Sequence, residues 1–168
     1  MAGLSFDIFC RVVDNYGDIG VCWRLSRQLA AQLGQGCVRL WVDDLGSFAR
    51  IEPGVDPQAG RQTVKGVDIV HWTQQPPPLA PHDVVIEAFA CDPPADFIER
   101  MVGCDSLWIN LEYLSAEAWV ESCHALPSPQ ANGLRKAFFF PGFTPGTGGL
   151  LREPGLLARR DAWQADPS

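Results

Sequence analysis

The stretch Ser5–Gly20, SFDIFCRVVDNYGDIG, joins two patterns that together predict the fold. Its first half is rich in Phe, Ile and Val, which is typical of a buried strand. Its second half, Val13–Gly20, is a short polar turn that leads into a helical pattern. A strand that runs through a turn into a helix is the repeating unit of a parallel α/β fold, so the same unit is expected again along the chain.

The segment Ile19–Leu33 predicts an amphipathic helix. Its apolar residues recur at four-residue steps, at Val21, Leu25, Leu29 and Leu33. Trp23 and Arg24 fall on other faces of this helix. Gly34 and Gly36 follow the last apolar position and are expected to end the helix, because glycine readily adopts the backbone conformation found there.

Five further apolar runs predict strands. They are Cys37–Val42, Val67–Trp72, Asp83–Phe89, Ser106–Leu114 and Lys136–Phe143. Residues 49–66 are rich in glycine and proline and are interpreted as a loop. Pro93–Pro94 open a helix that reaches about Val102, and Ser115 is expected to cap a helix over Ala116–Cys123. Strands separated by helices predict a Rossmann-like α/β domain, with a parallel sheet flanked by helices and right-handed crossovers.

The composition limits the classes of function. A length of 168 residues suits one domain, and 46% hydrophobic with 20% charged residues is typical of a globular chain. The net charge of −7 argues against nucleic-acid binding, which needs a basic face. No apolar run approaches membrane-spanning length, and the N-terminus lacks a basic leader followed by an apolar core, so neither a membrane anchor nor a signal peptide is expected.

The cysteines and histidines predict no metal site. The six cysteines form no CxxC pair, and the three histidines share no ligand-like spacing. Scattered cysteines beside Val, Phe and Trp suggest reduced core residues in a cytoplasmic protein.

Ligands of such sheets bind beyond the carboxyl ends of the strands. Four predicted loops meet on that rim, namely Asp14–Gly20, Ala90–Pro94, Glu112–Ser115 and Pro141–Gly149. In the third loop, Glu112, Tyr113 and Ser115 either contact a ligand in the cleft or simply cap and solvate the strand end. In the second loop, Asp92 before two prolines is interpreted as a helix N-cap.

The first rim loop is acidic where nucleotide-binding folds are glycine-rich. A dinucleotide site would need GxGxxG here, and only Gly17 and Gly20 match. Asp14 and Asp18 would repel a phosphate, so a cation suits the turn better, and arginine suits a carboxylate best because its planar fork bonds bidentately. The alternatives are a plain N-cap for Asp18 and an Asx-type turn for Asp14. Tyr16 either stacks on a planar group or covers the edge of the core.

Four blocks of the chain carry a resemblance to a known family. They are FDIFCRVVDNYGDIGVCWRLSRQLA (residues 6–30), VRLWVDDL (38–45), INLEYLSAEAWVESCHALPS (109–128) and FFFPGFTPGTGGLLRE (138–153). Together they resemble the bacterial protein-arginine rhamnosyltransferases of the EarP family, which modify translation elongation factor P. The DNYGDIG turn joined to WRLSRQLA is the most specific block, and the others agree in order and spacing.

The resemblance implies one half of an inverting glycosyltransferase of the GT-B architecture. Family members have about twice this length and transfer rhamnose from dTDP-β-L-rhamnose to an arginine of elongation factor P, without a metal or other cofactor. Residues 1–150 would then form the acceptor-binding N-terminal domain, and residues 151–168 a tail helix towards a missing donor-binding domain. The chain alone would be inactive, because most donor contacts belong to that second domain. Neither a nucleic acid nor a membrane is implied as a partner.

The resemblance also assigns roles to residues. Asp18 matches the family's proposed general base, and Asp14 an acid needed for activity. Asn15, Tyr16 and Gly17 would shape the loop between them. From their place on the rim, and not from the resemblance, Glu112, Tyr113 and Ser115 are candidates to contact the acceptor or the sugar. Two other functions stay open: a module that binds a basic loop of a protein partner without chemistry, and, less favoured by the two acids, a domain that binds a small nucleotide.

Overall fold

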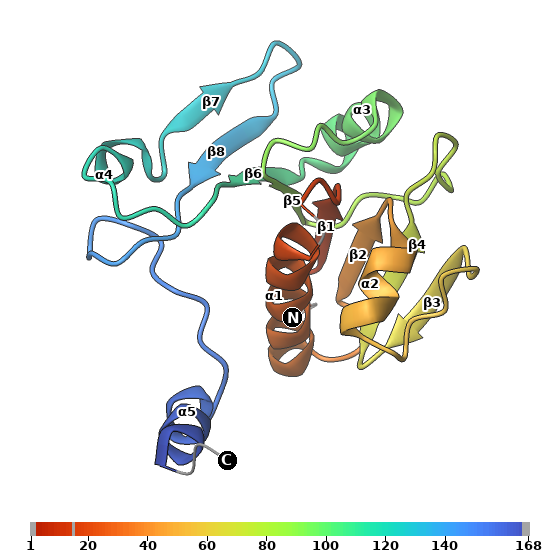
Figure 1. Ribbon diagram of the computed structural model, residues 1–168. Helices are drawn as coiled ribbons and strands as arrows, with labels where there is room; N and C mark the ends of the chain where they lie inside the picture. Colours follow the sequence, from red (N-terminus) through yellow and green to blue (C-terminus); the bar gives the residue numbers. More distant parts are fainter. Residues whose placement is uncertain (1–2, 15, 166–168) are drawn as a thin grey trace.

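The computed structural model describes residues 3–14 and 16–165, which form one eight-stranded sheet flanked by helices (Figure 1). The strands are β1 (Phe6–Cys10), β2 (Val38–Val42), β3 (Arg61–Val64), β4 (Val67–His71), β5 (Val84–Ala88), β6 (Leu107–Leu111), β7 (Pro127–Pro129) and β8 (Arg135–Phe139). The helices are α1 (Gly17–Leu33), α2 (Leu45–Ile51), α3 (Ala95–Cys104), α4 (Val120–Cys123) and α5 (Leu156–Ala165). All six predicted strands are present, and the predicted α/β class is confirmed.

The strand order across the sheet is β3-β4-β2-β1-β5-β6-β8-β7. The six inner strands are parallel, and only the edge strands β3 and β7 run antiparallel to their neighbours. From β1 the chain moves outward to β2 and β4, and it then returns to place β5 on the other side of β1. The loops after β1 and β5 therefore diverge, and the crevice between such loops is the usual ligand site of a doubly wound sheet.

The two faces of the sheet have different cores. Helices α1 and α2 cover one face and α3 covers the other (Figure 1). Because successive strand residues point to opposite faces, Ile8 packs under α1 and Phe9 under α3. The α3 side is aromatic, and the Phe9 ring lies 5.1 Å from Trp41 and 4.8 Å from Phe97. Such aromatic pairs stabilise the core beyond their buried area.

Helix α1 corrects one expectation from the sequence. The α1 residues buried against the domain are Asp18, Ile19, Cys22, Trp23, Ser26 and Ala30. Trp23 was predicted to lie off the apolar face of the helix, but it is 5% exposed and its ring packs on that of Phe48 in α2, with ring centroids 5.1 Å apart. The predicted apolar stripe from Val21 to Leu33 is exposed or only half-buried. The helix thus has two apolar stripes, because one faces α2 and the sheet while the other faces a groove described below.

The loop predicted over residues 49–66 is partly wrong. Helix α2 extends to Ile51, and β3 follows from Arg61. Helix α2 was missed because it is short, although its cap is regular: the Asp44 side chain accepts a hydrogen bond from the Ser47 N–H. Strand β3 was missed because an edge strand needs few apolar residues. It pairs with β4 and adds the Arg61–Asp68 ion pair.

Three predicted caps are also corrected. Ser115 does not cap a helix, since α4 begins only at Val120 and the Ser115 Oγ accepts instead from the Glu117 N–H two residues on. Asp92 is not the N-cap of α3, because Pro94 holds that position. Asp18 lies inside the first turn of α1 and Tyr16 precedes the helix, so the N-cap interpretation of Asp18 is wrong as well.

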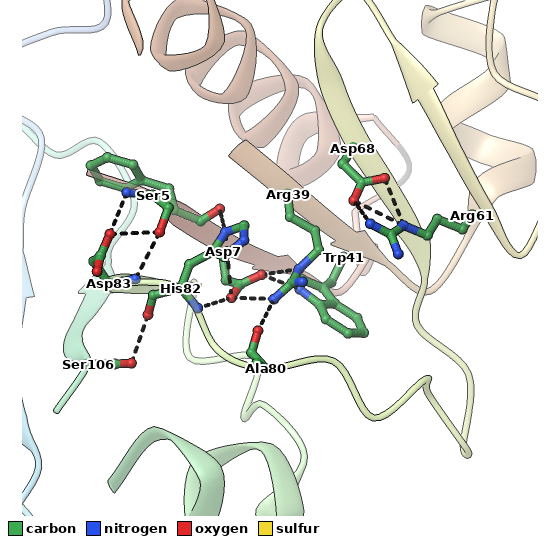
Figure 2. Close-up of polar contacts among 11 residues, drawn as sticks. Ser5, Asp7, Arg39, Trp41, Arg61, Asp68, Ala80, His82, Asp83 and Ser106 are labelled. Atoms are coloured by element: carbon green, nitrogen blue, oxygen red, sulfur yellow. Dashed lines mark hydrogen bonds and ion pairs between the residues drawn. The ribbon is translucent and has the colours of Figure 1, made fainter. Parts of the chain in front are cut away.

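A buried polar network ties the amino ends of the strands together (Figure 2). Asp7 on β1 has no exposed surface and accepts from Arg39 on β2, with Nη2 to Oδ2 at 2.8 Å. The indole of Trp41 and the backbone N–H of His82 donate to the same carboxylate. Arg39 also donates to the carbonyl of Ala80. Both charges are therefore paired and hydrogen-bonded, as buried charges must be.

The segment after β8 first contacts the domain, at residues 151 and 153, and then continues into α5. Arg24 of α1 pairs with Glu153 and donates to the Leu151 carbonyl. Beyond this contact, α5 buries none of its residues and lies apart from the sheet (Figure 1). The proposed boundary at residue 150 stays a prediction.

Candidate functional site

Asp18 is a deeply buried acid beyond the carboxyl end of β1. The residue is only 2% exposed. Its Oδ2 accepts from the backbone N–H groups of Val13 and Asp14, each at 3.1 Å, and its Oδ1 accepts from the Tyr113 hydroxyl at 3.1 Å. Because Asp18 lies in the first turn of α1, its charge is also close to the positive end of the helix dipole. All of these partners are neutral donors.

The other buried acids in the described part of the chain are paired with cations. Asp7 pairs with Arg39, Glu52 with Lys65 at 2.6 Å, and Glu87 with Lys136 at 3.1 Å. Among these four buried acids of the described residues, Asp18 alone has no lysine or arginine within ion-pairing distance. A carboxylate that is buried, ordered by neutral donors and left without a cation is poised to receive one.

A polar cavity of about 370 Å³ opens beside Asp18. It lies between the loops after β1 and β5, in the crevice that the strand order predicts. Its lining residues are Arg11, Val13, Asp18, Ala88, Phe89, Ala90, Cys91, Asp92 and Tyr113. The Arg11 guanidinium lies over the ring of Trp72, 4.7 Å from its centroid. The cavity is therefore lined by the carboxylates of Asp18 and Asp92 and by the guanidinium of Arg11, which stacks on Trp72.

A larger, apolar groove of about 670 Å³ reaches Asp18 from its other side. The exposed stripe of α1, with Val21 and Leu25, forms one wall, and Ile109 and Phe139 of the sheet form its floor. Asp14, Asp18 and Glu112 line the same groove. Asp18, Phe89 and Tyr113 line both cavities, so these three residues form the partition between them.

Tyr113 covers the Asp18 carboxylate. Its ring stacks on Phe89 with centroids 4.1 Å apart and planes inclined by 10°, and the residue is still 55% exposed. Burial of the hydroxyl raises the pKa of Tyr113, and so do the hydrogen bond to Asp18 and the negative charges of Asp18 and Asp14. Because the residue is half exposed and its hydroxyl makes one neutral hydrogen bond to Oδ1 of Asp18, an incoming donor can replace that bond at little cost.

The structure brings most of the predicted site residues together. Asp14, Gly17, Asp18, Glu112 and Tyr113 all line the groove. Asn15 was predicted to shape the acidic turn and lies outside the described residues. Tyr16 is 46% exposed and Ser115 is half-buried, and neither is among the residues that line the two cavities.

Sequence reasoning missed three residues at the site. Arg11 and Phe89 directly follow β1 and β5, so their place on the rim was the only available signal. Asn110 lies within β6, is 2% exposed, and donates to Glu112 while accepting from the Ala90 N–H at 3.2 Å. A buried asparagine in a central strand is unusual and could have been noticed from the sequence.

Two other kinds of site find no support in the described residues. Burial raises the pKa of the Cys91 thiol to about 12, so the cysteine in the polar cavity is a poor nucleophile. No group of His, Cys, Asp or Glu in residues 3–14 and 16–165 has the arrangement of a metal site.

In the same part of the chain, every helix is too short or too polar to cross a bilayer.

The fold and the site together define a class of protein, a doubly wound α/β domain with a buried carboxylate beside a cavity at its strand switch point. The chain belongs to the family described as Elongation-Factor P (EF-P) rhamnosyltransferase EarP, whose model matches residues 6–168. This confirms the resemblance drawn from the four sequence blocks.

The chain is similar to proteins named protein-arginine rhamnosyltransferase. It is 63% identical over 162 residues to the one from Pseudomonas putida, covering 95% of this chain and 43% of the relative. It is 60% identical over 166 residues to the one from Pseudomonas aeruginosa, covering 98% of this chain and 44% of the relative. The protein from Shewanella oneidensis is 52% identical over 171 residues. The chain thus spans less than half the length of the relatives it matches.

Proposed function

We propose that this chain is the acceptor-binding, N-terminal half of an inverting GT-B glycosyltransferase. In the complete enzyme, rhamnose passes from dTDP-β-L-rhamnose to an arginine side chain of elongation factor P. The family membership and the relatives' names support the transfer of rhamnose to a protein arginine. The chain alone binds the acceptor and does not transfer the sugar, because a second half supplies most of the donor contacts. Its six free cysteines support a reducing, cytoplasmic location.

The observation that carries this proposal is the cation-free burial of Asp18. A guanidinium that enters the polar cavity meets a carboxylate whose Oδ2 is already fixed by two backbone amides. Its planar fork replaces or joins the Tyr113 hydroxyl on Oδ1. Asp14, which is exposed beside the turn, and Glu112 add negative charge at the groove and attract the same cation.

Asp18 acts as a general base late in the reaction. A free guanidinium has a pKa of about 13.8 and an aspartic acid one of about 3.9, so complete deprotonation before attack would cost about 13 kcal/mol. The carboxylate instead orients the guanidinium and takes a proton as the new N–C bond makes the nitrogen acidic. The sugar carbon inverts, because the nitrogen attacks opposite the departing nucleotide. Much of the rate then comes from orientation.

The test is Asp18→Asn in the full-length enzyme, meaning this chain together with the part that its relatives possess in addition. The amide keeps the size of the side chain and can still accept from the two backbone amides, so the protein should fold. We expect turnover to fall by a factor of at least about 10² to 10⁴, the usual contribution of a general base. Asp105→Asn is the matched control, because it makes the same change at an exposed, left-handed position away from the site. Wild-type turnover in Asp18→Asn would remove Asp18 from the base role.

A non-catalytic binding module is the second candidate, because a buried carboxylate without a cation beside a cavity is sufficient to bind a basic side chain without any chemistry. Titration of the chain with elongation factor P, followed by NMR, should move the resonances of Gly17, Asp18 and Tyr113 under either candidate. Only an enzyme half gains transferase activity when the missing part is restored. Binding without any transfer in the full-length protein would favour the module.

A further inference from the structure

The loop after β5 has an unusually strained backbone. Phe89, Ala90 and Asp92 have φ values of +57°, +53° and +51°, and none of them is glycine. This left-handed conformation costs about 1–2 kcal/mol for each such residue. Six non-glycine residues of the described chain have a positive φ, and three of them lie within residues 89–92. Strain of this kind persists only where the surroundings hold it in place.

Asn110 supplies part of the hold, beside the backbone hydrogen bond that the Phe89 N–H donates to the Leu111 carbonyl at 2.7 Å. It reaches from the central strand β6, and its Oδ1 accepts from the Ala90 N–H at 3.2 Å. Its Nδ2 donates to Oε1 of Glu112, so one buried amide joins the strained loop to the acid at the groove. Ala90 and Glu112 lie just beyond the last paired residues of β5 and β6, although the Glu112 N–H still donates to the Phe139 carbonyl of β8. The side chain therefore organises the rim, and the strand would form without it.

The strained loop in turn positions the cover of Asp18. Because Phe89 is left-handed, its ring turns towards the groove and stacks on Tyr113 at 4.1 Å. The Tyr113 hydroxyl then reaches Oδ1 of Asp18. A continuous set of contacts thus runs from Asn110 through Ala90 and Phe89 to Tyr113 and Asp18.

We propose that Asn110 is a positioning residue for the acidic site, because it holds the Phe89–Tyr113 stack over Asp18 and orients Glu112 at the groove. Its effect on the acceptor rests on the proposed function, whereas its effect on Tyr113 does not. Removal of Asn110 should let the loop relax, unstack Tyr113 and leave the Asp18 carboxylate without its hydroxyl donor.

The test uses Tyr113 as its own reporter. The chain has two tyrosines, so Tyr16→Phe leaves Tyr113 as the only phenol, and ¹³Cζ-tyrosine NMR follows its stacking and its titration. Asn110→Leu keeps the size of the side chain but removes both hydrogen bonds. We expect the ring-current shift from Phe89 to disappear and the pKa of Tyr113 to fall towards that of a free phenol. Asn132→Leu is the control, since it removes a similar bond to the Leu134 N–H far from the site.

A rescue variant separates positioning from general folding. In Asn110→Asp/Glu112→Gln the hydrogen bond to residue 112 is re-formed with donor and acceptor exchanged, and the introduced carboxylate still accepts from Ala90. We expect this double variant to recover the Tyr113 signal of the parent. If Asn110→Leu does not fold, the double variant carries the test alone. A folded Asn110→Leu with the parent Tyr113 signal, or a folded double variant without it, would overturn the proposal.

The acceptor measurement distinguishes this proposal from the proposed function. If elongation factor P binds the parent chain, Asn110→Leu should weaken that binding about tenfold, the value of roughly 1.4 kcal/mol, while Asn132→Leu should not. Unchanged affinity in Asn110→Leu would overturn the positioning role and leave the proposed function intact. If the parent chain does not bind the acceptor but Tyr113 still responds to Asn110→Leu, the proposed function fails and the positioning of Tyr113 stands.

Discussion

Asp7 and Asp18 are both buried carboxylates near β1, and their surroundings differ in one respect. Asp7 at the amino end of the strand meets a buried arginine, an indole and a backbone amide (Figure 2). Asp18, beyond the carboxyl end, meets two backbone amides and a phenol. The first carboxylate is neutralised within the fold, whereas the second keeps an uncompensated charge beside two cavities. The comparison indicates that a buried acid contributes to stability where its cation is internal, and is available for function where the cation must come from outside.

Of the substitutions that test this difference, the one that removes the charge of Asp7 should have the largest effect. Asp7→Asn leaves the Arg39 guanidinium buried without its counter-charge, so the free energy of unfolding should fall by about 3–5 kcal/mol. Urea denaturation of the chain followed by tryptophan fluorescence measures this loss. A change below about 1 kcal/mol would mean that water or a shifted side chain replaces the ion pair, and the assignment of Asp7 to stability would be wrong.

The matching substitution at Asp18 should have little effect on stability. Asp18→Asn removes a charge that has no internal cation and keeps the hydrogen-bonding shape, so the free energy of unfolding should stay within about 1 kcal/mol of the parent. The same urea experiment gives the answer side by side with Asp7→Asn. Equal losses in the two variants would contradict the division between a structural and a functional carboxylate.

A cation supplied from outside should sharpen the difference further. A ligand that presents an arginine at 100 times its dissociation constant raises the free energy of unfolding by about 2.7 kcal/mol. We expect elongation factor P, used under such conditions, to raise the thermal midpoint of the parent chain and of Asp105→Asn, but not that of Asp18→Asn. Equal stabilisation of the parent chain and Asp18→Asn would place the bound cation elsewhere.

Removal of the hydroxyl over Asp18 should have a smaller effect. Tyr113→Phe keeps the stack on Phe89 but deletes the donor to Oδ1. Because the ring is half exposed, water can reach the vacated position, and the loss of stability should be about 1 kcal/mol or less. Differential scanning calorimetry of the two proteins measures it. A loss of several kcal/mol would show that Tyr113 is a structural partner of Asp18 and not a movable cover.

The smallest expected effect lies at the tail. The Arg24 guanidinium lowers the pKa of Glu153 to about 2, so this carboxyl titrates below its ordinary value of 4.5. Contact between the tail and α1 is therefore favoured above pH 4.5 and is lost as the pH falls towards 2. NMR of the amides of residues 150–153 should show this release, and Arg24→Gln should cause it at neutral pH. The pair is partly exposed, so the stability of the sheet should not change measurably.

Regular elements with strong patterns were predictable from the sequence. The six parallel strands, α1 and its end at Gly34, and the start of α3 after Pro94 were expected from apolar runs, glycine and proline. Helix α2 and the strands β3 and β7 were missed, because they are short and their stability comes from pairing and packing with distant segments. Local pattern carries little information about such elements.

The acidic turn was predictable, but its physical state was not. The two acids of the turn, Asp14 and Asp18, indicated that the turn prefers a cation to a phosphate, because two carboxylates repel an anion. Whether those acids were already neutralised depends on which lysines and arginines the fold brings near. Only the tertiary structure decided that Arg39 lies on Asp7, that Tyr113 lies on Asp18, and that Asn110 holds the loop between them. These contacts join residues 20 to 95 positions apart, so no local pattern in the sequence indicates them, and only the path of the folded chain brings their partners together.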